Sequence, residues 1–452
     1  MANSLQFNIT NKSGIDNTNV YIGFWGASLN ASINNKPMTT YTWYALDTIN
    51  SFIINTTTSG RFYIAYNDTF TPNGSNIPSI ITSSSEAYLK RFDKFELTFD
   101  GTDSAVADLT SIDFWSIPMS LETSLKGVKN NKQLNGFKGT TTGHTIFTKL
   151  KALSSPAQST ETANNLVTAF NNANNALPQG IINDLTSPVS ALVEDKSGNF
   201  VRIIGPNSYP PFGNPNNGTT GYPGLPFTPY NTFETYFDYL IDTFGPSKKS
   251  KELTTLGDGK IARLKGNFAG STQGTTNAYK AQSYDVWTYI DNDGNLQIKG
   301  TTGIVGTIDL YVNKWDLLAP SSVYGGSPAY ATTKGGSTTT PANDIYGWIF
   351  GDFFAGINIG AVGSATTIDK VVVGDMNSTE WFSTLPANAM LFDKLWPKGT
   401  TNYWNQWAQE LNSLSDAYNF AYAERFSSPQ ISLAPTSADT LTLVLLPESI
   451  TK

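Results

Sequence analysis

The chain has 452 residues, a formal net charge of −7, no cysteine and a single histidine. Without cysteine or a second histidine it has no disulfides, no zinc–thiolate site and no metal site built from several histidines. The sequence has no basic run and no apolar run long enough to cross a membrane, which argues against a nucleic-acid partner and against a membrane-spanning segment.

Residues 1 to about 120 are predicted to form successive strands. Charged residues make up only 14 % of the chain and aromatic residues 13 %. Aromatic and threonine side chains favour strands, while Asn, Gly and Pro favour turns, so a mainly β fold is expected. The clearest strands, which alternate apolar and polar residues, are at 4–10, 19–26, 59–67, 92–100 and 110–117.

The segment 91–120 places one carboxylate in each of two predicted strands. In the first strand, three apolar residues alternate with Glu96, Thr98 and Asp100, which therefore share one face of a sheet. If the two strands pair as a hairpin centred near position 104, Glu96 falls opposite Asp113. Two carboxylates that face one groove are the pair needed for glycoside hydrolysis, although an acidic pair on strands is more often a solvated face.

Residues 121–250 are predicted to form a separate α/β lobe. Apolar residues recur at helical spacing over 166–177 and again over 233–244, where the stripe indicates core packing. A strand near 199–204 leads into a loop over 205–230 that is rich in Pro, Gly and Asn. Loops of this length are often functional, and surface decoration is the equal alternative.

Strands resume after residue 251, and an Asp-Gly pair within 290–298 indicates a hairpin. Helical segments are predicted within about 344–418, and the chain closes with two strands, of which the last is apolar enough to be central. This order predicts a β domain formed by 1–120 and 251–452, interrupted by the lobe 121–250.

The motifs in this order resemble glycoside hydrolase family 64, the β-1,3-glucanases related to thaumatin-like proteins. The run from Glu96 to Asp100 is similar to the family's Glu-x-Thr-x-Asn, with Asp in place of Asn. The run from Ala107 to Phe114 and the pair Ile117-Pro118 match the strand that follows. The resemblance extends along nearly the whole chain and is specific around residues 60–120.

Such a resemblance implies a thaumatin-like β barrel or sandwich with an inserted α/β lobe and a wide groove between them. It also implies inverting hydrolysis of β-1,3-glucan, without a cofactor or metal, by Glu96 and Asp113. Partial burial raises the pKa of a carboxyl, so Glu96, set between apolar neighbours, is expected to be the acid and Asp113 the base.

The resemblance further implies which residues touch the glucan. Thr98, Asp100 and Thr110 would line the site, and Asp108 stands where the family has Asn. Trp115 shares a face with Asp113 in the predicted strand and is the best placed aromatic side chain to stack on a sugar ring.

Departures from the family pattern leave two functions open. The tryptophan of the family's loop is missing near Ala105 and Val106, and two asparagines are replaced by Asp100 and Asp108. The chain is then either an active glucanase with altered subsites or a non-catalytic glycan-binding, defence or toxin-like protein. Family members are typically secreted, but the first residues lack the pattern of a signal peptide, so the sequence does not assign a compartment.

Overall fold

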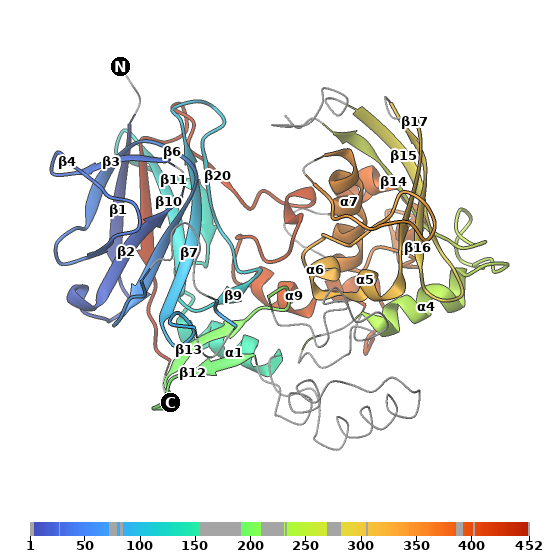
Figure 1. Ribbon diagram of the computed structural model, residues 1–452, viewed down its shortest axis with the longest axis horizontal. Coiled ribbons are helices and arrows are strands. Elements are labelled where there is room, and N and C mark those ends of the chain that lie inside the picture. The colour runs from blue at the N-terminus through green and yellow to red at the C-terminus, as the bar shows by residue number, and fades with distance from the viewer. Residues whose placement is uncertain are drawn as a thin grey trace.

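Figure 1 shows the computed structural model, with a curled sheet at one end and a four-stranded sheet backed by helices at the other. The structure describes residues 4–26, 28–71, 79–81, 85–153, 191–208, 230, 233–268, 282–303, 306–342, 344–385, 392–400 and 403–450. The helix predicted over 166–177 and most of the loop predicted over 205–230 lie outside these residues. The mainly β prediction is confirmed.

The curled sheet, which we call the half-barrel, is built around β6 (Ser51–Tyr66). This strand pairs with several neighbours along its length because it has 16 residues. The other strands of the half-barrel are β1 (Leu5–Asn11), β2 (Val20–Trp25), β3 (Ser28–Ile33), β4 (Lys36–Pro37), β5 (Trp43–Ala45), β7 (Arg91–Phe99), β8 (Val106–Leu109), β10 (Met119–Leu125), β11 (Val128–Gly136), β20 (Ile431–Ser432) and β21 (Thr440–Leu445).

The strand order of the half-barrel is β11-β10-β21-β1-β6-β7-β8-β20. Strand β21 lies between β10 and β1, so the apolar strand near the end of the chain is central, as predicted. Alternate residues of these strands fill the concave side, where Phe7, Phe62 and Phe95 stack with ring planes within 10° of each other. The opposite side of β6 and β7 carries a smaller buried cluster that includes Tyr63, Ala65 and Phe92, and the polar residues Arg61 and Glu96 lie further along the same side.

The side chain of Asn135 links the two edges of the half-barrel. Asn135, on β11, is almost completely buried and accepts a hydrogen bond from the Leu109 N–H of β8 at 2.6 Å. Its amide nitrogen donates to the Pro429 carbonyl just before β20. Because β11 and β20 stand at opposite ends of the strand order, Asn135 curls the sheet towards closure.

The other end of the molecule, which we call the helical half, is built on an antiparallel four-stranded sheet. Its strands are β14 (Lys260–Phe268), β15 (Gln282–Ile290), β16 (Leu296–Thr302) and β17 (Gly306–Val312). Helix α7 (Ile345–Ile359) packs on the inner face and is buried nearly all round. The other helices are α1 (Gly143–Leu153), α4 (Glu234–Phe244), α5 (Lys314–Leu318), α6 (Pro320–Val323), α8 (Ser378–Thr384) and α9 (Gln406–Asn412).

Several sequence predictions are confirmed in the helical half. Helix α4 has the predicted apolar stripe, and Phe237, Leu240 and Phe244 are buried in the core. The Asp-Gly hairpin joins β15 to β16. A small pair of strands, β18 (Thr367–Ile368) and β19 (Val371–Val372), completes this half. Among the described helices, none is long and apolar enough to cross a membrane.

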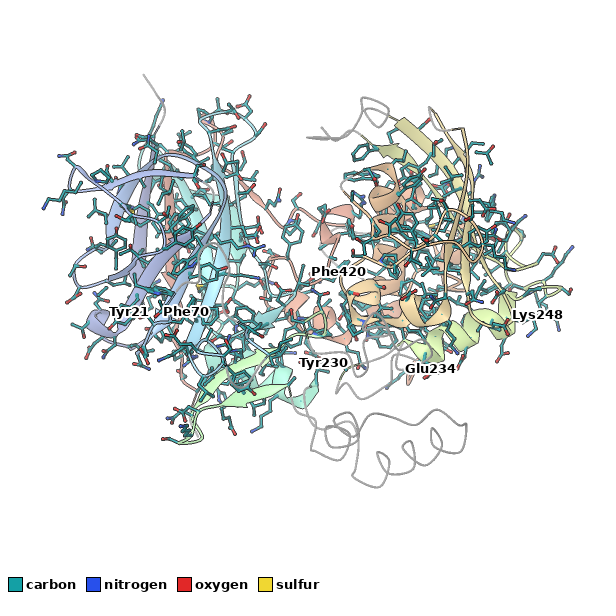
Figure 2. All side chains as sticks on the ribbon, viewed as in Figure 1. Tyr21, Phe70, Tyr230, Glu234, Lys248 and Phe420 are labelled. Atoms are coloured by element: carbon teal, nitrogen blue, oxygen red, sulfur yellow. The ribbon has the colours of Figure 1, made fainter. Side chains whose placement is uncertain are left out.

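A third sheet and the last part of the chain join the two ends. The sheet consists of β12 (Leu192–Glu194), β13 (Phe200–Ile204) and β9 (Phe114–Trp115), in the order β12-β13-β9. Phe420 is buried between the half-barrel and the helical half (Figure 2). Residues 251–452 contribute to the cores of both ends, and the division into domains given above remains a prediction.

Candidate active site

Glu96 lies on the convex side of the half-barrel, in the middle of β7. Arg61 on β6 is directly opposite on one side and Asp108 on β8 on the other. The Arg61 Nε is 2.8 Å from the Glu96 Oε1, and 38 % of the Glu96 side chain is exposed. Phe95 and Leu97 point into the core, as the period of two predicts.

The predicted pairing of Glu96 with Asp113 is wrong, because Asp108 occupies the place opposite Glu96. Strand β8 ends at Leu109, and the chain then leaves the half-barrel. Thr110 bridges to Tyr418, and the Ser111 N–H donates to the Tyr418 carbonyl at 2.7 Å. Beyond that point β9 pairs with β13 rather than with β7. The sequence alone could not reveal these distant partners.

Asp113 nevertheless returns to the same face of the sheet as Glu96. Its Oδ2 lies 2.5 Å from the Nζ of Lys94, which is two residues before Glu96 on β7 and shares its face. Asn207 and Ser208 donate to the other carboxylate oxygen at 3.0 and 3.1 Å. A third of the Asp113 side chain, 33 %, is exposed. Lys94 therefore ties Asp113 to the face of β7 that carries Glu96, and both carboxylates are partly exposed.

The environment of Asp113 favours its ionised form. Burial alone would raise the pKa of this carboxyl, but the charge of Lys94 and the hydrogen bonds from Lys94, Asn207 and Ser208 outweigh it. The pKa of Asp113 therefore lies below its ordinary value. The side chain is a carboxylate at neutral pH, as a general base must be.

Asp108 has the opposite environment. Burial, followed by the negative charges of Glu96 and Glu424, raises the pKa of Asp108 to about 8. The site therefore contains one carboxyl group that keeps its proton at neutral pH, Asp108, and one that is ionised, Asp113. Divergent pKa values in a group of neighbouring carboxyls are typical of acid–base sites.

Glu424 reaches this site from the last part of the chain. It belongs to the short 3₁₀ helix η6 (Ala423–Arg425). Its neighbour Arg425 is anchored in the helical half, where the Nε is 2.8 Å from the Oδ1 of Asp352 on α7 and the guanidinium lies 3.6 Å from the ring centre of Trp348. Tyr284 and Ser378 also donate to Asp352. This buried network fixes η6 and with it the position of Glu424.

The other predicted substrate-binding residues are spread around Glu96. Thr98 is on the same face of β7, and its hydroxyl accepts a hydrogen bond from the Ser59 N–H at 3.1 Å. Thr110 is half-buried beside Tyr418. Asp100 is exposed and holds the turn after β7 by accepting two hydrogen bonds from Thr102.

Trp115 is not placed for contact with a sugar. It is fully buried in the third sheet, where its ring stacks on Phe200 of β13 with centroids 5.3 Å apart. The strand that carries it pairs with β13, so its face belongs to a different sheet from the one that the sequence suggested. In this structure the ring offers no free face for stacking.

Sequence reasoning missed the cations and the amide of the site. Lys94 could have been found, because it precedes Glu96 by two residues and shares its face in any strand. Arg61 and Asn207 come from distant segments and carry no local signal. Among the described residues, no three His, Asp or Glu side chains gather as metal ligands.

Comparison with solved structures identifies the fold. A laminaripentaose-producing β-1,3-glucanase in complex with laminaritetraose matches with a TM-score of 0.53 and 14 % identity, covering 99 % of each chain. A β-1,3-glucanase domain (GH64) from Clostridium beijerinckii matches with a TM-score of 0.52 and 12 % identity, covering 98 % of each. No protein-family model and no curated protein matches the sequence. The chain therefore shares the fold of these glucanases, as its motifs implied.

Proposed function

We propose that this protein hydrolyses β-1,3-glucan with Glu96 and Asp113 as its two carboxyl groups. The observation that carries the proposal is that Lys94, which shares a face of β7 with Glu96, binds Asp113, so that two partly exposed carboxylates lie on one face of the sheet. The fold supports it, because the two glucanases named above share it over almost the whole chain.

The proposed reaction proceeds with inversion. Glu96, as the acid, protonates the glycosidic oxygen, while Asp113, as the base, takes a proton from the water that attacks the anomeric carbon from the opposite side. Inversion requires about 6.5–9.5 Å between the two carboxyl groups, so that this water fits. The lowered pKa of Asp113 supports its role as the base.

Asp108 is proposed to bind the substrate as a neutral acid. A protonated carboxyl donates a hydrogen bond, so Asp108 can hold a sugar oxygen and place no second negative charge beside Glu96. Its raised pKa supports this role. Thr98, Asp100 and Thr110 would line the same groove, whose far wall we assign to the segment with Tyr418 and Glu424.

A glycan-binding protein without catalysis is the alternative. The ion pair of Glu96 with Arg61 favours it, because the guanidinium occupies the carboxyl group that would have to reach the glycosidic oxygen of a substrate. An active enzyme requires that the incoming glucan draws Arg61 away from Glu96 or that Arg61 binds a substrate hydroxyl instead.

The deciding experiment measures reducing ends released from laminarin by the wild type and by Glu96→Gln. General acid catalysis contributes about 100-fold or more, so we expect at least that loss in the variant. Glu122→Gln, which changes a carboxylate paired with Lys129 elsewhere on the half-barrel, is the matched control. Wild-type rates in Glu96→Gln would remove Glu96 from the mechanism. No release by the wild type, together with retention on insoluble glucan, would establish the alternative.

A further inference from the structure

The outer face of the sheet β14–β17 carries a second group of residues suited to sugars. Residues alternate across this sheet, so Leu264, Val286 and Leu310 are buried against the helices on the inner face. The outer face carries partly exposed aromatic side chains instead, and Figure 1 shows α5, α6 and α7 on the inner side. This face belongs to the helical half, whereas Glu96 belongs to the half-barrel.

Three outer-face residues form a row that crosses the strands. Tyr289 on β15 pairs with Gln297 on β16, which pairs with Tyr311 on β17. The two tyrosines are thus two strand spacings apart, about 9.6 Å, with an amide between them. That separation is close to the length of a disaccharide, that is, to two sugar repeats, so the first and third units of a glucan segment could rest on the two rings while the amide faces the unit between them.

The polar groups of this row are held in place before any ligand arrives. The Asp309 carboxylate accepts a hydrogen bond from the Gln297 Nε2 at 2.6 Å and another from the Tyr311 hydroxyl at 2.8 Å. Lys299 lies over the Tyr289 ring, with its Nζ 5.6 Å from the ring centre. Side chains fixed in this way lose little further entropy on binding.

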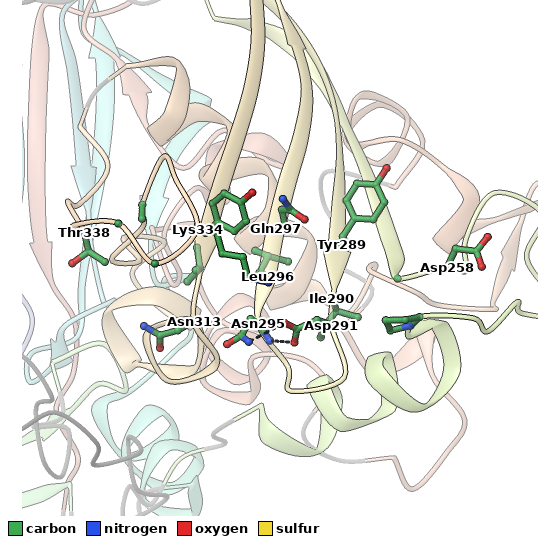
Figure 3. Close-up of a pocket in the computed structure, with 17 residues that line it drawn as sticks. Asp258, Tyr289, Ile290, Asp291, Asn295, Leu296, Gln297, Asn313, Lys334 and Thr338 are labelled. Carbon is green, nitrogen blue, oxygen red and sulfur yellow. Dashed lines mark hydrogen bonds between the residues drawn. The ribbon is translucent and has the colours of Figure 1, made fainter.

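A cavity of about 520 Å³ lies over the row, which is within the usual range for ligand sites, roughly 300–1,000 Å³. Figure 3 shows Gln297 and Tyr289 on one side of it, with Lys334 and Thr338 on the loop that forms its wall. This loop extends the sheet, because Ala331 exchanges two backbone hydrogen bonds with Tyr311.

We infer that this cavity is a second glycan-binding site, which holds a neutral β-glucan chain away from the proposed catalytic groups. Aromatic faces take the apolar side of a sugar ring, and an amide and a carboxylate take its hydroxyls. The lining carries two acidic residues, Asp258 and Asp291, and one basic residue, Lys334. With both signs of charge present, the cavity does not favour an anionic or a cationic ligand over a neutral one. The choice of a β-glucan rather than another neutral glycan rests on the proposed function.

The test counts laminarihexaose molecules bound per chain by isothermal titration calorimetry. Glu96→Gln serves as the parent, so that the ligand stays intact, and Tyr289→Ala with Tyr311→Ala is added to it. We expect one fewer ligand bound per chain and about tenfold weaker retention on insoluble β-1,3-glucan. Tyr311→Phe keeps the ring and should retain most of the binding. Tyr44→Ala, at a half-buried tyrosine of the half-barrel, is the control.

The outcomes separate this inference from the proposed function. If the double tyrosine variant unfolds at the temperature of its parent yet binds as many ligands with the same retention, the inference is overturned. A parent that binds neither laminarihexaose nor insoluble glucan also overturns it. If the wild type releases no reducing ends but the tyrosine variant still loses a bound ligand, only the proposed hydrolysis fails.

Discussion

Asp108 is a single residue that makes the stability of the folded protein depend on pH. Its pKa is raised to about 8 in the folded protein, chiefly by burial and then by the charges of Glu96 and Glu424. The folded state therefore holds this proton more tightly than the unfolded state does. The contribution of Asp108 to the free energy of unfolding is therefore complete below the ordinary carboxyl pKa of about 4 and is lost as the pH rises through about 8.

Asp108→Asn should remove this pH dependence. Relative to the variant, the wild type should lose up to about 5 kcal/mol in its free energy of unfolding between about pH 4 and pH 8. Chemical denaturation at several pH values measures the difference. Asp103→Asn, at an exposed carboxyl of the same hairpin, is the control. A constant difference between wild type and Asp108→Asn over this range would contradict the assignment.

Lys94 makes a separate prediction about the base. Replacing it with Met removes the cation that lowers the pKa of Asp113, and burial, which raises this pKa, then acts with less opposition. The acidic limb of the activity profile on laminarin should therefore move to higher pH, because Asp113 must be ionised to act.

Lys129→Met, which breaks the more exposed pair with Glu122, should leave that limb in place. An unmoved limb in an active, folded Lys94→Met protein would mean that Asp113 is not the base.

At the scale of elements, the sequence predicted the strands and the helix whose position depends on the burial of their own apolar residues. Alternation located β1, β2 and β7, and the apolar stripe located α4, because each needs only its own residues to place one face in a core. The face of Glu96 was predicted for the same reason. The pairing of the segment that carries Asp113 was not predicted. Thr110 bridges to Tyr418 and β9 pairs with β13, and such long-range pairing leaves no trace in a short window of sequence.

Asn135 supplies an element-scale prediction about β11. Asn135→Ala would leave the buried Leu109 N–H without its acceptor and should cost about 1–3 kcal/mol in the free energy of unfolding. Denaturant titration measures this loss. Asn30→Ala, at an exposed asparagine on β3 whose side chain accepts a hydrogen bond from the Asn55 side chain, should change stability by less than about 0.5 kcal/mol. Equal effects of the two variants would mean that Asn135 does not hold the edges of the half-barrel together.

At the scale of the whole molecule, the buried pair of Arg425 and Asp352 fixes the segment that runs from the helical half to the half-barrel. Arg425→Met should destabilise the protein by about 3–5 kcal/mol, because Asp352 stays buried without its cation. Thermal and denaturant unfolding measure the effect. Arg263→Met, which breaks a more exposed pair with Asp285, should cost about 1 kcal/mol or less. Similar losses in both variants would contradict a special role for the Arg425 anchor.

The parallel pairing of β1 with β21 has a consequence for synthesis on the ribosome. Strand β21 follows every other described strand in the chain and inserts between β1 and β10, so the half-barrel cannot finish until β21 has emerged. Until then β1 and β10 present unpaired edges, which are sites of aggregation in a nascent chain. Expression hosts that translate slowly, or chaperones that cover strand edges, should therefore affect the yield of this protein more than that of one whose sheets close early.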